Sequence, residues 1–224
     1  MKERPIIFSA PMVHAILAGT KSQTRRMIKP QPDLSILKPN IDLEYRTRLD
    51  GEFRTNHVLC CSNGLPVYQY LCPHGQVGDR LWVRETYFSE VAGDKNFPVW
   101  YRATEEKTFP YKSAWKPSIY MPRWASRILL EITDVRVERL QDISEDDAKS
   151  EGLRYTSKDS GKTWKYGIAD ADGQPGTDNT GWAWNQWNVS PTKAYSTLWN
   201  KIHGPDSWDK NPWVWVIEFK RMQL

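Results

Sequence analysis

The pattern of apolar and polar positions along the chain predicts a series of strands with a few helices between them. Alternation with a period of two residues indicates half-buried strands, and its longest run covers residues 128–139, where Val135 and Val137 alternate with charged neighbours. Apolar residues at three- and four-residue steps predict helices over residues 11–17 and 191–202. The expected strands cover residues 5–8, 22–26, 81–85, 99–103, 128–139 and 213–219.

Two stretches without a clear period are expected to be insertions. Residues 30–70 begin with two prolines that end the preceding strand, and only residues 44–48 and 67–70 could form strands of a hairpin. Residues 155–190 are rich in Gly, Asp, Asn, Thr and Trp and predict a long loop, either a stacking clamp or lid or a surface flap. We expect one domain over residues 1–224 that includes both insertions.

A short acidic helix is predicted after the longest strand. Ser144 is a suitable N-cap, Asp147 follows three residues later as in a capping box, and acidic residues in the first turn suit the helix dipole. Gly152 is expected to end the helix, which places Glu151 in its last turn. A carboxylate held there without a cation tends to have a raised pKa and can donate a proton. From position alone, an ordinary exposed glutamate is the simpler interpretation.

Composition narrows the class of protein. The 224 residues include 12 Trp, 10 Tyr and 6 Phe, which can build a core or stack on nucleobases. The formal net charge of +4 permits nucleic-acid binding without requiring it. No run of 18 apolar residues occurs, so no membrane span is expected. Three cysteines, an odd number, argue against a disulfide framework and fit the cytoplasm.

The candidate metal ligands are Cys60, Cys61, Cys72 and His74. Structural zinc usually takes Cys-x2-Cys pairs, and adjacent cysteines seldom bind one ion together. We therefore expect buried thiols with a turn at residues 73–75, and neither a metal nor another cofactor.

The turn after the first predicted helix combines three functional groups. Gly19 falls where a helix C-cap would lie, and Lys21, Thr24 and Arg26 follow it. In a strand, Ser22, Thr24 and Arg26 would share one face. An amine beside a hydroxyl can act as a base toward a nucleophile, and an arginine can bind an anion or a base edge. A helix followed by a strand with surface cations explains the same pattern.

Four stretches occur together in an order that is typical of one family. They are Gly19-x-Lys21-x-x-Thr24-x-Arg26, Gly78-Asp79-Arg80-Leu81-Trp82-Val83, the acidic helix from Ile143 to Gly152, and Val214-Trp215-Val216-Ile217-Glu218-Phe219. In these motifs the chain resembles the ASCH (activating signal cointegrator homology) family, and most of all its larger, tryptophan-rich phage and prophage members. The resemblance implies an α+β fold, a PUA-like mixed β-barrel with flanking helices and two long insertions, in the cytoplasm of a bacterial host.

The resemblance also implies a chemistry. Some small ASCH proteins are amidohydrolases of N4-acetylcytidine that need no metal. Their lysine (proton acceptor), threonine (nucleophile) and glutamate (proton donor) correspond by motif to Lys21, Thr24 and Glu151. This chain is about twice as long as those enzymes, so its insertions could remodel the cleft. Other relatives are RNA-binding modules or ribonucleases, so a non-catalytic reader of single-stranded RNA or DNA and a ribonuclease remain alternatives to an enzyme acting on a modified nucleoside.

Further residues are candidates for substrate binding. Glu85 ends a predicted strand and could point into a cleft, although a surface carboxylate is the simpler interpretation. Arg123, Trp124 and Arg127 lie in a loop where arginines and aromatic residues alternate, which could hold a phosphate and a base or form a tryptophan lid with solvated arginines. Arg26 is the remaining candidate for substrate binding.

Overall fold

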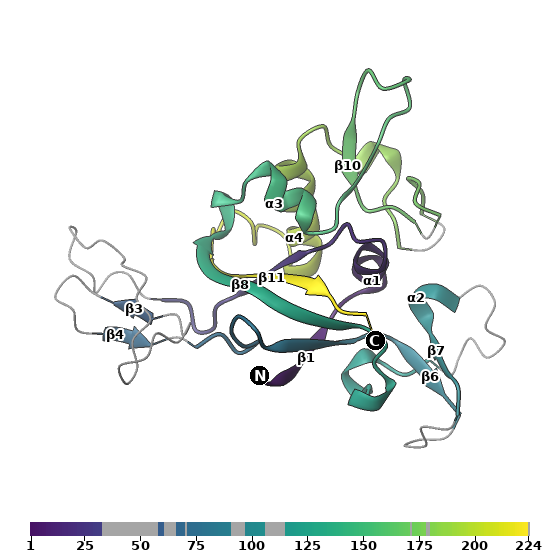
Figure 1. Ribbon diagram of the computed structural model, residues 1–224. Helices are drawn as coiled ribbons and strands as arrows, with labels where there is room; N and C mark the ends of the chain where they lie inside the picture. Colours follow the sequence, from purple (N-terminus) through teal and green to yellow (C-terminus); the bar gives the residue numbers. More distant parts are fainter. Residues whose placement is uncertain are drawn as a thin grey trace.

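A mixed five-stranded sheet forms the centre of the computed structural model (Figure 1). The described residues are 1–32, 58–60, 66–69, 71–90, 97–105, 115–170, 172–177 and 180–223. In spatial order the strands are β1 (Glu3–Ile7), β5 (Arg80–Arg84), β8 (Leu129–Arg139), β11 (Trp213–Arg221) and β2 (Gln23–Met27). The first pair, β1 and β5, is parallel, whereas the other neighbouring pairs are antiparallel.

Helices and three short hairpins surround this sheet. The α-helices are α1 (Ala10–Leu17), α2 (Arg102–Glu105), α3 (Glu145–Ser150) and α4 (Pro191–His203). The 3-10 helices are η3 (Ser118–Tyr120), η4 (Arg123–Ala125), η5 (Leu140–Asp142) and η6 (Trp184–Gln186). The hairpins pair β3 (Val58–Cys60) with β4 (Pro66–Gln69), β6 (Tyr87–Ser89) with β7 (Val99–Tyr101), and β9 (Arg154–Thr156) with β10 (Lys165–Gly167). The predicted α+β class is confirmed.

Burial explains why the central strands and flanking helices form. Four consecutive residues of β11, from Val214 to Ile217, are each at most 2% exposed, so this strand is covered on both faces. The buried side chains of α1 and α4 join the same core as the sheet. Of the helices in the described part of the chain, none combines the length and the apolar character that a membrane span requires.

A side-chain contact links the two edge strands of the sheet. The Nη2 atom of Arg26 on β2 donates a hydrogen bond of 2.7 Å to the backbone oxygen of Ile7 on β1. Phe8, which follows β1, packs against Phe219 of β11 with 6.1 Å between ring centroids. The sheet is therefore curled, although no backbone ladder joins β1 to β2 among the described residues. Barrel closure stays a prediction.

Two predicted segments differ from the structure. The strand expected over residues 99–103 ends at Tyr101, whose N–H donates to the Glu105 carboxylate at 2.9 Å, and α2 begins directly after it. Residues 155–190 are more than a loop, because they contain β10 and part of β9. Trp182 and Trp187, 4% and 3% exposed, anchor this segment in the main core. The strand expected at residues 44–48 lies outside the described residues.

Candidate functional site

The glycine turn after α1 meets the C-terminal end of α3. Gly19 has a φ of 73° and Gly152 a φ of 98°, so each leaves its helix in the left-handed conformation expected from the sequence. Ser22 N–H donates to Ser150 O at 3.0 Å, and Lys21 forms an isolated antiparallel bridge with Glu151. Two residues 130 positions apart in the sequence are thus held together by the backbone.

The Lys21 amine is buried and donates three hydrogen bonds. Its acceptors are the backbone oxygens of Gln23 at 2.7 Å and Glu151 at 2.8 Å, and Glu151 Oε2 at 2.9 Å. Lys21 is 4% exposed and Glu151 3%, so their ion pair is shielded from water. Burial lowers the pKa of the Lys21 amine, and the nearby Glu151 carboxylate only partly offsets this effect.

The other carboxylate oxygen of Glu151, Oε1, is held less closely than Oε2. Oε1 lies 3.6 Å from Arg25 Nη1, and it is buried without a hydrogen-bond partner among the described residues. A buried acceptor without a partner is costly, so such an atom marks a place where a ligand donor can bind. Lys21 and Arg25 both flank the Glu151 carboxylate, so the expectation of a glutamate without a nearby cation is wrong.

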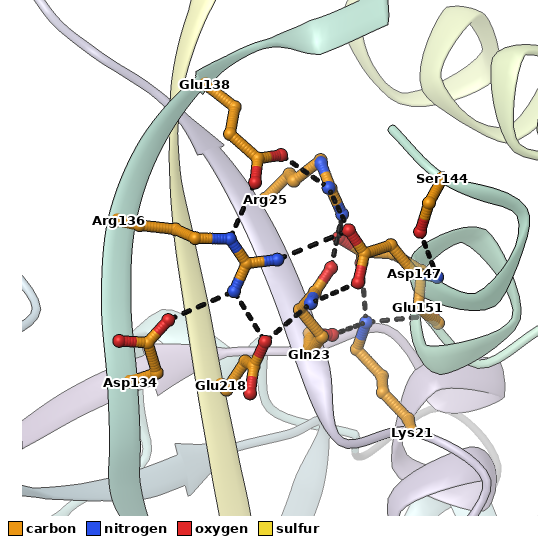
Figure 2. A network of polar contacts seen from close by, with 10 residues as sticks. All are labelled: Lys21, Gln23, Arg25, Asp134, Arg136, Glu138, Ser144, Asp147, Glu151 and Glu218. Atoms are coloured by element: carbon orange, nitrogen blue, oxygen red, sulfur yellow. Dashed lines mark hydrogen bonds and ion pairs between the residues drawn. The ribbon is translucent and has the colours of Figure 1, made fainter. Parts of the chain in front are cut away.

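A network of charged side chains fixes α3 against the sheet (Figure 2). Arg25 on β2 bonds to Asp147 at 3.0 Å and to Glu138 of β8 at 2.8 Å, and Gln23 donates to Asp147 at 3.0 Å. Burial alone would raise the pKa of Asp147, but hydrogen bonds from Gln23 and Arg25 and the charges of Arg25 and Arg136 lower it overall. The network therefore positions the helix that carries Glu151.

Thr24 and Arg26 lie on β2, the strand that also carries Gln23 and Arg25 of this network. Thr24 is 4% exposed and pairs with Ile217 of β11, and no described hydrogen bond joins its hydroxyl to Lys21. Lys21 Nζ and Arg26 Cζ lie 5.5 and 5.3 Å from the centre of the Phe8 ring. The amine and the guanidinium that flank Thr24 in the sequence thus share one aromatic ring.

The Nε of Arg26 is buried and has no partner among the described residues. Ser22, which we expected to share a strand face with Thr24 and Arg26, precedes β2 and is exposed.

The other predicted binding residues lie around η4. Glu85 is 2% exposed rather than on the surface, and its two oxygens accept from Arg127 Nε and Nη2 at 2.9 Å each. Burial raises the pKa of Glu85 although Arg127 opposes it. Arg123 pairs with Glu3 at 2.7 Å, and Trp124 packs on a small apolar cluster. Within the described residues, no hydrogen bond or ion pair connects these four residues to Lys21 or Glu151.

Several residues at the site were not predicted from the sequence. Gln23 and Arg25 stand two positions apart on β2, and that spacing could have indicated a shared polar face. The Tyr195 hydroxyl of α4 is buried near Glu151, and burial together with the Glu151 charge raises its pKa well above the usual value. Phe8 carries no local signal beyond its apolar character.

A cavity of about 810 Å³ lies next to the buried pair. Its lining includes Ser22 and Ser150, the sequence neighbours of Lys21 and Glu151. Lys21, Thr24 and Glu151 do not line it, because their side chains are covered.

The predicted turn at residues 73–75 is confirmed, since Gly75 N–H donates to Cys72 O at 3.2 Å. Cys72 is a half-buried free thiol, and burial raises its pKa to about 11. Over the ranges that the structure describes, no group of three or more His, Cys, Asp or Glu residues is arranged to hold a metal ion. The side chain of Cys60 and the whole of Cys61 lie outside the part of the chain that the structure describes.

Comparisons of the chain with protein-family models, curated proteins and solved structures find no match. The resemblance to ASCH proteins therefore rests on the four sequence motifs.

Proposed function

We propose that this chain hydrolyses the amide of an N4-acylated cytidine, using Lys21, Thr24 and Glu151. The observation that carries the proposal is the buried pair of Lys21 and Glu151, with 2.9 Å between Nζ and Oε2. When one proton moves from Nζ to Oε2, both groups become neutral, and desolvation favours neutral groups. The result is a free amine and a carboxylic acid, which are the base and the acid that the reaction needs.

The proposed reaction has two halves. In the first, Thr24 Oγ1 attacks the acyl carbon while its proton moves to Lys21 Nζ. The carbon–nitrogen bond then breaks, and Glu151 gives its proton to the departing exocyclic amine of cytidine. In the second half, water hydrolyses the acyl ester on Thr24 and releases the carboxylic acid. The first half restores the charged form of the pair.

Two buried polar atoms support the choice of substrate class. Among the described residues, Arg26 Nε has no hydrogen-bond partner, and Glu151 Oε1 has only the 3.6 Å ion pair with Arg25 Nη1. An acylated cytosine offers carbonyl oxygens to Arg26 Nε and its N4–H to Glu151 Oε1. A guanidinium beside the acyl oxygen also stabilises the negative charge that develops there. The Lys21–Thr24 hydrogen bond is expected to form when the substrate binds, as is common for catalytic contacts.

The test is release of free cytidine from N4-acetylcytidine, followed by chromatography. Thr24→Val removes the hydroxyl with little change of shape and is expected to lower kcat by about a thousandfold. Thr197→Val, which removes a hydroxyl bonded to Lys193 O on α4, is the matched control and should keep wild-type activity. Absence of hydrolysis by the wild type over a panel of N4-acylated cytidines, or full activity of Thr24→Val, would contradict the proposal and favour a non-catalytic reader.

A further inference from the structure

The hairpin of β9 and β10 exposes aromatic rings at the cavity that adjoins the buried pair. It projects from the body of the molecule above α3 and α4 (Figure 1). Tyr155 is 64% exposed and Trp164 48%, and their rings meet edge to face with 5.4 Å between centroids. Clustered exposed rings of this size usually mark a binding surface, because water solvates them poorly.

The same hairpin carries an excess of positive charge. Between residues 154 and 167 there are four cations, Arg154, Lys158, Lys162 and Lys165, and one anion, Asp159, which gives a net charge of +3. None of the four cations forms an ion pair with a described residue. Asp159 is engaged in the turn, where it accepts from Ser157 Oγ at 2.6 Å and Thr163 N at 2.8 Å. Lys158 and Lys165 lie over the Trp184 ring, with Nζ 5.1 and 4.8 Å from its centre, and their positive charges are not neutralised by a described carboxylate.

The aromatic rings border a hollow of suitable size. The cavity of about 810 Å³ is lined by Tyr155, Trp164 and Tyr166 on the hairpin side and by Thr20 opposite. Arg154 lines this cavity and also a neighbouring one of about 260 Å³ that runs beside α1. The larger volume lies within the range of small-ligand sites, roughly 300–1,000 Å³, and the smaller lies just below it. The smaller cavity is also lined by Asp170 and Asp172, so an anionic ligand is expected to occupy the larger one, which Lys149 and Arg154 line.

We infer that this hairpin surface binds single-stranded nucleic acid. A base enters the larger cavity and stacks on Tyr155 or Trp164, and the phosphates lie along Arg154, Lys158 and Lys162. Rings that stack on any base, combined with cations that follow a backbone, are typical of sequence-tolerant single-strand sites. An acidic peptide would use the cations and leave the rings without a partner. This inference goes beyond the proposed function and does not depend on it.

The test is fluorescence anisotropy with labelled oligouridine and oligothymidine of about 12 nucleotides, within the length that such sites cover. The double variant Tyr155→Ala/Trp164→Ala is expected to weaken binding tenfold or more. Tyr120→Ala is the matched control, because Tyr120 is 68% exposed on η3, and it should bind as the wild type does. Lys158→Ala and Lys162→Ala should each reduce the slope of log affinity against log salt by about 0.7.

The inference is overturned if the wild type binds neither oligonucleotide at low salt, or if the double aromatic variant binds as tightly as Tyr120→Ala. Equally tight binding of a poly-glutamate peptide of matched charge would also overturn it. Unchanged circular dichroism and Tm establish that the variants fold. Hydrolysis of free N4-acetylcytidine is measured on the same variants and should be unaffected, so the failure of either proposal is recognised separately.

Discussion

Lys21 and Glu151 form a buried ion pair with 2.9 Å between Nζ and Oε2, although 130 residues separate them in the sequence. The pair joins the turn after the first helix to the end of the acidic helix, and the charged network of Figure 2 holds that helix on the sheet. Its energetic and chemical roles can be tested separately.

Removing both partners of this pair should destabilise the protein by less than the two single removals added together. Glu151→Gln leaves the Lys21 ammonium buried without its counter-ion and is expected to lower the free energy of unfolding by about 3 kcal/mol at neutral pH. The double variant Lys21→Met/Glu151→Gln should lose less than the sum of the single variants. Urea denaturation measures both values. Strict additivity would show that the two side chains do not interact.

The two helix-terminal glycines should differ in their tolerance of a side chain. A Cβ at Gly152 would lie 3.0 Å from the Cβ of Ala15 and 3.2 Å from that of Lys21, whereas a Cβ at Gly19 would meet no atom within 4 Å. Both have a positive φ, so Gly19→Ala is expected to cost about 1 kcal/mol. Gly152→Ala adds a steric clash and should cost at least about 2 kcal/mol. If urea denaturation gives the same loss of unfolding free energy for Gly19→Ala and Gly152→Ala, the packing around Gly152 relaxes to accept the extra methyl group.

The pair of Glu85 and Arg127 is expected to stabilise the fold. Arg127→Met removes both hydrogen bonds to a buried carboxylate and should lower stability by about 3 kcal/mol. Adding Glu85→Gln to that variant removes the buried charge and should restore part of the loss. If the pair instead binds substrate, the measurement would show a raised KM with little change in Tm.

His74 should make the protein less stable as the pH falls. Burial, reinforced by the charges of Arg26 and Arg4, lowers the pKa of His74 from 6.5 to about 4. Between these values the unfolded chain binds a proton that the folded one does not, so stability decreases as the pH falls from 6.5 to about 4. The loss attributable to His74 is up to about 3 kcal/mol.

His74→Gln should therefore flatten the dependence of urea-unfolding free energy on pH in this interval. His203→Gln is the control, since the pKa of His203 is also lowered by burial but by less. If His74→Gln leaves the pH dependence of stability unchanged, His74 is not the group that destabilises the protein as the pH falls.

Local signals in the sequence predicted much of the architecture. Ser144 accepts a hydrogen bond from Asp147 N at 3.1 Å, as the capping pattern indicated, and Gly19 and Gly152 end their helices. These features depend on neighbours within a few residues, so the sequence displays them directly. The strands of β9 and β10 are three residues each, too short for an alternating pattern to emerge, and they were predicted as loop.

The site could be predicted only in part, because its charges are balanced by residues distant in the chain. Arg25 is 3% exposed, and nothing in its local pattern distinguishes it from a solvated cation. Its burial depends on Glu138 and Asp147, more than 100 positions away. Motif resemblance selected Lys21 and Glu151, whereas the supporting residues Gln23, Arg25 and Asp147 required the three-dimensional structure.

The main-chain bridge between Lys21 and Glu151 fixes the positions of these two residues independently of their side chains. Since the backbone bond from Ser22 N to Ser150 O needs neither side chain, altered side chains at these positions remain next to each other. Under the proposed function, a variant changed at Thr24 alone would keep Lys21 and Glu151 adjacent and could trap an unhydrolysed ligand for identification.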